Sequence, residues 1–277
     1  MVPGYNVAMT KPAKTAKGKE QRRTEQRNPA SRNLDRMAAI EIVRVMNRED
    51  RKPAIAVGRE LRAIGRAVDL IVEGIRAGGR LFYAGAGSSG RMGVLDAAEC
   101  PPTFGVSRQV VQAIIAGGSR AMTRAVEGAE DSTASGEHDL LRRKLTRNDV
   151  VVGISASGTT PYVIGALAFA KRRGAATVAV TANGRSPVAR VAQITIAPET
   201  GPEVVTGSTR LKAATAQKMV LNMLSTAVMT RLGHVYDNWM IDMTPTNGKL
   251  RERSLRVLAG ASGRGLSAAE DALRKSE

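Results

Sequence analysis

The sequence predicts an α/β protein in which helices pack on a mainly parallel, five-stranded sheet. Along residues 81–196, short apolar stretches that are typical of buried strands alternate with helical stretches. Alternation of this kind indicates a parallel sheet with right-handed crossovers. Apolar residues make up 43% of the 277-residue chain, but aromatic residues make up only 3%. A core of Ala, Val, Ile, Leu and Met favours this architecture over an aromatic-rich β-sandwich.

Two helices are expected ahead of the sheet. Asn33-Leu34-Asp35 offers capping side chains, and apolar residues then repeat at helical spacing as far as Val45. After Pro53, six apolar residues within 57–75 step by three or four and form one continuous face. Gly78 and Gly79 are expected to end this second helix.

The sheet itself is predicted from five apolar stretches, at residues 81–84, 110–116, 150–154, 177–181 and 194–196. Helices are expected from the segment after residue 91 through Ala98, then at 121–126, 161–172 and 208–232. The last of these has an apolar face wide enough for the core or for a subunit interface. The chain after Gly260 is expected to be weakly organised. Ligands of parallel sheets bind beyond the carboxyl ends of the strands, so functional residues are expected in the loops there.

The net charge of +17 is partly concentrated near the start of the chain. Residues 1–36 hold nine Lys or Arg and three acids, which leaves a net charge of +6. We expect residues 1–23 to form a disordered basic extension, for which the sequence suggests no function. A basic surface attracts nucleic acids or anionic metabolites. Nucleic-acid binding is the weaker alternative, because no zinc-finger or RNA-recognition motif accompanies the charge.

Other features narrow the class of protein. A single cysteine, Cys100, excludes an internal disulfide and fits a reducing cytoplasm, where we expect the protein. We find no secretion signal and no run of 18 apolar residues, so no membrane span is expected. No Cys/His cluster suggests zinc, and we expect neither a metal nor a cofactor. His138 and His234 have no obvious Asp partner and are expected to be structural or surface residues.

Residues 85–91 read Gly-Ala-Gly-Ser-Ser-Gly-Arg and lie between a predicted strand and a predicted helix. Gly87 allows close backbone approach to a ligand, the helix N-terminus offers N–H groups to an anion, and Ser88 and Ser89 add hydroxyl donors. The pattern also fits the dinucleotide-binding G-x-G-x-x-G motif. That alternative requires an acidic residue about 20 positions further on. Residues 106–118 contain none, which favours a different phosphorylated ligand.

Residues 155–160 form a second loop of this kind, Ser-Ala-Ser-Gly-Thr-Thr, between a strand and a helix. Ser155, Ser157, Thr159 and Thr160 supply four hydroxyls, whereas a helix cap needs one. A phosphate monoester has three terminal oxygens, which could accept hydrogen bonds from all four hydroxyls. The segment does not match the nucleophile elbow of hydrolases. The two loops together predict binding of a phosphorylated small molecule.

Carboxylates are the remaining candidates for acid–base chemistry. Glu99 lies before Cys100-Pro-Pro, three acids fall in the stretch Glu-Gly-Ala-Glu-Asp at 127–131, and Glu203 follows Gly-Pro. Acidic side chains are by default solvated surface groups, so spacing alone does not single out any of them.

These motifs together resemble the sugar isomerase (SIS) fold and, more narrowly, the N-acetylmuramic acid 6-phosphate etherase family. The two loops are similar to the sugar-phosphate loops of the fold. Residues 201–204 and 207–212 resemble the later active-site segment of the fold. Further stretches that resemble the family lie at residues 24–28, 94–105, 115–118, 127–131, 216–222 and 243–247. The resemblance covers about residues 24–258. Glucokinase regulatory proteins share the fold, but they are much longer and carry two such domains.

The resemblance implies a three-layer α/β/α SIS domain with N-terminal helices over residues 24–245. It also implies a C-terminal helical segment over 246–277 that is shorter than in the family. The implied reaction cleaves the lactyl ether of N-acetylmuramic acid 6-phosphate with water, giving N-acetylglucosamine 6-phosphate and D-lactate in peptidoglycan recycling. The family's acid maps onto Glu99 and its second active-site glutamate onto Glu130. Glu203, Ser208 and Lys212 are expected to bind or orient the sugar, and a homodimer is expected.

In this class of reaction the sugar opens to its aldehyde, a base removes the C2 proton, lactate leaves from C3, and water then adds. One carboxyl group must be protonated and the other ionised, so we take Glu99 as the acid and Glu130 as the base. Two alternatives on the same fold are a sugar-phosphate isomerase and a non-catalytic regulator that senses a sugar phosphate. Such regulators often carry a helix-turn-helix domain, for which the residues before Leu34 are too few and too polar.

Overall fold

The computed structural model describes residues 23–243 and 248–276. Its centre is a five-stranded sheet in the order β2-β1-β3-β4-β5, and every neighbouring pair is parallel. The strands are β1 (Leu81–Gly85), β2 (Val111–Ile115), β3 (Val150–Ile154), β4 (Ala176–Val180) and β5 (Ile194–Ile196). The predicted parallel sheet is therefore confirmed, with strand ends that differ from the expected ones by at most one residue.

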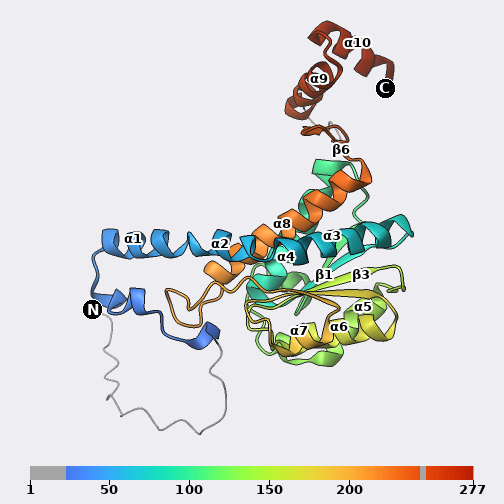
Figure 1. The fold of residues 1–277 in the computed structure, drawn as a ribbon. Helices are drawn as coiled ribbons and strands as arrows, with labels where there is room; N and C mark the ends of the chain where they lie inside the picture. Colours follow the sequence, from blue (N-terminus) through green and yellow to red (C-terminus); the bar gives the residue numbers. More distant parts are fainter. Residues whose placement is uncertain (1–22, 244–247, 277) are drawn as a thin grey trace, which may run out of the picture.

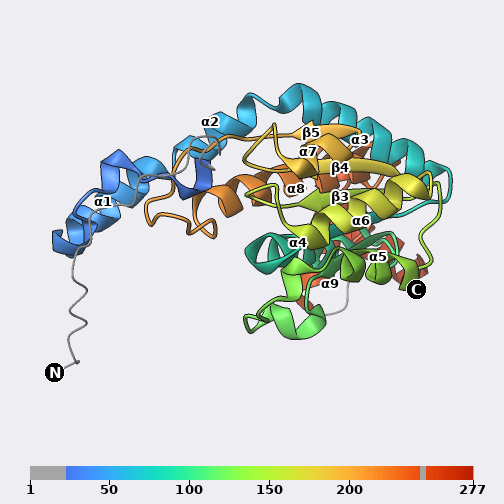
Figure 2. The same ribbon diagram turned by 90° about the horizontal axis from the view of Figure 1, so that it is seen from below.

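Helices cover both faces of the sheet (Figures 1 and 2). One face carries α3 (Leu61–Arg76), α4 (Gly87–Phe104) and α8 (Lys212–Leu232), and the other carries α5 (Thr133–Arg142), α6 (Pro161–Arg172) and α7 (Pro187–Val191). Successive strand residues point to opposite faces. Tyr83 and Val152 thus belong to the core under α3, α4 and α8, whereas Phe82 and Val151 belong to the core under α5, α6 and α7. The three-layer prediction is confirmed.

The segment before the sheet differs from the prediction of two helices. It contains η2 (Pro29–Ser31), η3 (Leu34–Arg36), α1 (Ala39–Glu49) and α2 (Lys52–Gly58) ahead of α3. Asn33 makes no side-chain cap; instead the carboxylate of Glu41 accepts a hydrogen bond from the N–H of Ala38, 2.8 Å away, at the start of α1. The helix expected after Pro53 is interrupted beyond Gly58, a poor helix former. At this interruption, the Glu60 carboxylate accepts a hydrogen bond from the N–H of Ala197.

The helix expected at residues 121–126 is wrong. Residues 121 and 122 end a short 3-10 turn, η4 (Gly118–Met122), and residues 123–126 are in no helix. A second turn, η5 (Ala129–Asp131), and the helix α5 follow. The guanidinium of Arg91 donates to the carbonyl oxygens of Ala121 and Met122, which an α-helix would need for its own bonds. Helix α4 also continues beyond Ala98, through two prolines, to Phe104.

The last part of the chain is more ordered than predicted. After α8, a short antiparallel hairpin of β6 (Val235–Tyr236) and β7 (Trp239–Met240) leads to α9 (Gly248–Ser262) and α10 (Leu266–Ser276). Gly260 of α9 lies against the Trp239 ring, where a larger residue would collide. Figure 1 shows α9 and α10 beyond the end of α8, away from the sheet. The expected disorder of residues 1–23 falls almost entirely outside the described residues, which start with η1 (Arg23–Glu25).

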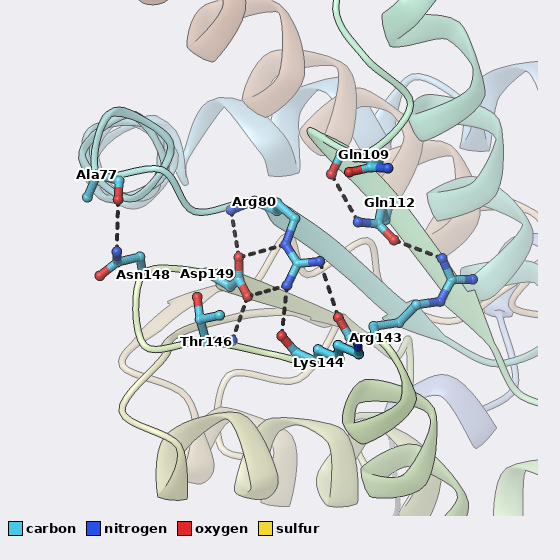
Figure 3. Close-up of polar contacts among 9 residues, drawn as sticks. All are labelled: Ala77, Arg80, Gln109, Gln112, Arg143, Lys144, Thr146, Asn148 and Asp149. Atoms are coloured by element: carbon cyan, nitrogen blue, oxygen red, sulfur yellow. Dashed lines mark hydrogen bonds and ion pairs between the residues drawn. The ribbon is translucent and has the colours of Figure 1, made fainter.

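A polar cluster joins the amino ends of β1 and β3 (Figure 3). The guanidinium of Arg80 donates to both carboxylate oxygens of Asp149, at 3.1 and 2.8 Å, and to the carbonyl oxygens of Arg143 and Lys144. Burial alone would raise the pKa of Asp149, but the hydrogen bonds from Arg80 and from the N–H of Thr146 lower it. This cluster fixes one end of the sheet and leaves the carboxyl ends of the strands free for function. In the described residues, none of the helices is long and apolar enough to cross a membrane.

Candidate active site

A cavity of about 470 Å³ opens at the carboxyl ends of β1 and β3. These are the neighbouring strands at which the sheet order reverses, the usual place for a ligand in an open parallel sheet. The lining residues come from the two predicted loops, from η1, from η5 and from the segment before α8: Thr24, Glu25, Ala86, Gly87, Ser88, Ser89, Glu130, Asp131, Ala156, Ser157, Thr159, Thr160, Pro161, Gly207 and Thr209. A larger groove of about 870 Å³ runs beside the C-terminal half of α4 but includes neither loop.

The first loop is shorter than the sequence suggests, because Gly87 already belongs to α4. Gly87, Ser88 and Ser89 form the first turn of this helix and line the cavity. The residue at the N-cap position, Ala86, makes no side-chain hydrogen bond to the helix. The first N–H groups of a helix have no partner within it, so this end offers donors and a partial positive charge to an anion.

Three of the four hydroxyl-bearing residues of the second loop line the cavity, namely Ser157, Thr159 and Thr160. Ser155 is buried beneath them, where its Oγ accepts from the N–H of Gly158 at 3.0 Å and lies 2.8 Å from Oγ1 of Thr160. Gly158 has φ +71°, and a Cβ there would collide with the Ser186 hydroxyl. The loop is therefore held in one shape, in which Ser155 contacts the hydroxyl of Thr160, a residue that lines the cavity.

Of the two predicted catalytic carboxylates, one lines the cavity and one does not. Glu130, in η5, lines it together with Asp131. Glu99 is exposed on α4 and is absent from the lining. It comes twelve residues after Gly87, which at the helical rise of 1.5 Å per residue corresponds to about 18 Å along the axis. The structure thus does not bring Glu99 and Glu130 of one chain together.

Two residues that were predicted to contact the sugar, Glu203 and Lys212, are buried, and neither lines the cavity. The ammonium of Lys212 is fully buried and lies 2.6 Å from the carboxylate of Glu49. Both carboxylate oxygens of Glu203 accept backbone N–H groups, those of Lys212 and Ala213, at the start of α8. Burial would raise the pKa of Glu49, but hydrogen bonds from Lys212, Lys52 and Asn28 outweigh it and lower the pKa to about 2. For Glu203 burial dominates and raises the pKa. The third such residue, Ser208, stands between Gly207 and Thr209 but is not itself in the lining.

Comparisons with known proteins identify the family of this chain. The model of the glucokinase regulatory protein N-terminal SIS domain matches residues 63–171, and the SIS domain model matches residues 125–227. The N-acetylmuramic acid 6-phosphate etherase of Clostridium beijerinckii is 55% identical over 254 residues, which are 92% of this chain and 84% of that protein. The chain belongs to the N-acetylmuramic acid 6-phosphate etherase family. The N-acetylmuramic acid 6-phosphate etherase of Pectobacterium atrosepticum is 53% identical over 254 residues, which are 92% of this chain and 84% of that protein.

Experimental structures of more distant proteins share the fold of this etherase-family chain. One is a putative phosphosugar isomerase from Bacteroides fragilis, with a TM-score of 0.55, 23% sequence identity, and coverage of 73% of this chain and 95% of that one. At this level of identity the likeness concerns the fold alone. The SIS fold that the sequence predicted is confirmed by it and by the matching domain models.

Thr24 and Glu25 of this family member line the cavity, although the sequence did not single them out and they lie far from either loop. Gly207 and Thr209 also line it, and they belong to the segment that resembles the later active-site segment of the fold. The stretch 24–28 was visible as a family-like motif, but nothing local to it indicated that it reaches the site. The expectation that His234 lacks an acidic partner is wrong, because its Nδ1 lies 2.7 Å from the Asp242 carboxylate. The β6–β7 hairpin brings these two residues together, and neither lines the cavity.

Proposed function

We propose that this chain cleaves the D-lactyl ether of N-acetylmuramic acid 6-phosphate, as a carbon–oxygen lyase of peptidoglycan recycling. The proposal rests on one observation: the N-terminus of α4, three hydroxyl-bearing residues of the second loop and Glu130 all line the same cavity. The first two features suit a phosphate group and the third suits a base. The relatives that bear this enzyme's name match almost the whole chain, which supports the same activity.

The reaction would proceed by elimination and then addition. Ser88, Ser89 and the second loop would hold the phosphate. The sugar reacts in its open-chain form, whose aldehyde makes the proton on C2 acidic. Glu130 takes that proton, the C3–oxygen bond breaks, and Glu99 donates a proton to the departing lactate oxygen. Water then adds across the new C2–C3 double bond, placing its hydroxyl on C3 and a proton on C2. The products are D-lactate and N-acetylglucosamine 6-phosphate, and the two carboxyl groups return to their starting states.

A second chain would complete this site. Glu99 lies about 18 Å along α4 from the first loop, too far to share the cavity of its own chain. We therefore propose a cytoplasmic homodimer in which Glu99 of one chain serves the cavity that contains Glu130 of the other. The exposed position of Glu99 on α4 supports this arrangement, since a partner could reach it.

The separate roles of the two carboxyl groups can be tested with Glu99→Gln. This variant keeps the base but lacks the acid, so it should stop releasing lactate while still exchanging the C2 hydrogen with solvent. Lactate is measured enzymatically, and exchange is measured by mass spectrometry of the sugar in deuterated water. Glu130→Gln is the matched variant and should lose both signals. Lactate release by Glu99→Gln at the parental rate would contradict the assignment of the acid.

A further inference from the structure

The N-terminal segment reaches the candidate active site although it lies outside the sheet and its loops. Thr24 and Glu25 of η1 line the cavity beside Gly207. The carbonyl oxygen of Thr24 accepts from the N–H of Gly207 at 3.2 Å. A Cβ at position 207 would come within 3.1 Å of Oε2 of Glu25. The absence of a side chain at Gly207 thus leaves room for the Glu25 carboxylate at the wall of the cavity.

Hydrogen bonds of the nearby Asn28 anchor the backbone that carries Glu25. Asn28, three residues further on, is buried, and its amide donates to the Glu49 carboxylate at 2.9 Å and to the carbonyl oxygen of Pro202 at 3.0 Å. Glu49 is in turn paired with the buried Lys212. This network ties the N-terminal segment to the start of α8. It holds Glu25 at a fixed edge of the cavity, although the side chain itself is exposed.

The charges around the cavity restrict what Glu25 can do. Three lining residues are acidic, namely Glu25, Glu130 and Asp131, and none of the described lining residues is Lys or Arg. An ionised carboxylate is only an acceptor of hydrogen bonds, so it cannot help to bind a phosphate. It can bind a neutral donor, such as a hydroxyl or an amide N–H, and it disfavours a second anionic group at the same place.

We propose that Glu25 is a specificity-determining residue that accepts a hydrogen bond from a hydroxyl or amide N–H of the sugar. The inference rests on the proposed function, since it assigns Glu25 to the sugar part of the same substrate. Phosphate is held at the loop side of the cavity, and Glu25 binds the sugar ring at the wall beside Gly207. Glu25 takes no proton in the reaction.

Two variants at this position and one control test the proposal. Glu25→Ala removes the acceptor, so the KM for N-acetylmuramic acid 6-phosphate in the lactate assay should rise about 10-fold or more, with kcat within about 3-fold. Glu25→Gln keeps an acceptor oxygen and should recover most of the loss. The dissociation constant of inorganic phosphate alone, measured by calorimetry, should stay the same or fall, because a nearby negative charge is removed. Glu73→Ala, at an exposed site of α3, should change none of these values.

Several results would overturn the proposal. Unchanged KM in Glu25→Ala would remove Glu25 from substrate recognition. Equal weakening of inorganic phosphate and sugar phosphate would mean that Glu25 only supports the cavity, and a fall in kcat alone would place it in the chemical step. If the parent protein releases no lactate, the proposed function fails separately. Calorimetry with N-acetylglucosamine 6-phosphate against inorganic phosphate then still decides the role of Glu25, because only the sugar phosphate should bind more weakly to Glu25→Ala.

Discussion

Lys212 and Glu49 form an ion pair that is almost completely shielded from water. Their side chains are 0% and 2% exposed, and the two charged groups lie 2.6 Å apart. A second cation, Lys52, contacts the other oxygen of the same carboxylate, but its side chain is half exposed. Because the folded-state pKa of Glu49 is about 2 and its ordinary value is 4.5, this pairing stabilises the fold fully above about pH 4.5. The stabilisation is lost as the pH falls toward 2.

The two lysines allow a matched test of this pair. Lys212→Met leaves a buried carboxylate with weaker partners, so at pH 7 the free energy of unfolding should fall by about 3–5 kcal/mol. Lys52→Met removes a half-exposed partner and should cost about 1 kcal/mol or less. Urea denaturation measures both values. If the Lys212→Met variant kept the parental stability but had a higher KM, the ion pair would not stabilise the fold. Lys212 would then contact the substrate, as the sequence suggested.

At the scale of single elements, the strands could be predicted almost to the residue. A strand that is buried on both faces of a parallel sheet reads as a continuous apolar run, as the residues of β3 do. The helices were harder wherever a distant side chain decides their ends. Arg91 holds the carbonyl oxygens of Ala121 and Met122 in a turn, and no pattern within residues 121–126 reveals that contact.

The same distinction applies to the candidate site. The hydroxyl-rich loops could be recognised because each lies within one short stretch of sequence at a strand–helix junction. Glu25 could not, because the hydrogen bonds that place its segment join residues far apart in the sequence. The N–H of Gly207 donates to Thr24, and Asn28 donates to Glu49 and Pro202. Lys212 follows a Gly-Ser-Thr-Arg stretch that resembles a binding loop, but the first turn of α8 points its side chain into the protein. Resemblance locates such residues along the chain without fixing the direction of their side chains.

At the scale of the whole molecule, the proposed role of Glu99, which does not line the cavity of its own chain, requires two chains to share each site. If two chains share each site, a mixed dimer of Glu99→Gln and Glu130→Gln contains one site with both carboxyl groups intact. Random exchange of equal amounts makes half of the dimers mixed, so lactate release should recover to about a quarter of the parental rate. Either variant alone should stay inactive. Absence of any recovery, with exchange verified by mass spectrometry of the native dimers, would contradict a shared site.

The central claim is that this chain releases D-lactate by breaking the bond between C3 of the sugar and the ether oxygen. The most direct measurement is the reaction of the purified full chain with N-acetylmuramic acid 6-phosphate in water enriched in heavy oxygen, followed by mass spectrometry of both products. Elimination and water addition predict equal amounts of D-lactate and N-acetylglucosamine 6-phosphate, with the heavy oxygen on the sugar and none in the lactate. Heavy oxygen in the lactate, or no lactate from folded protein, would contradict the account.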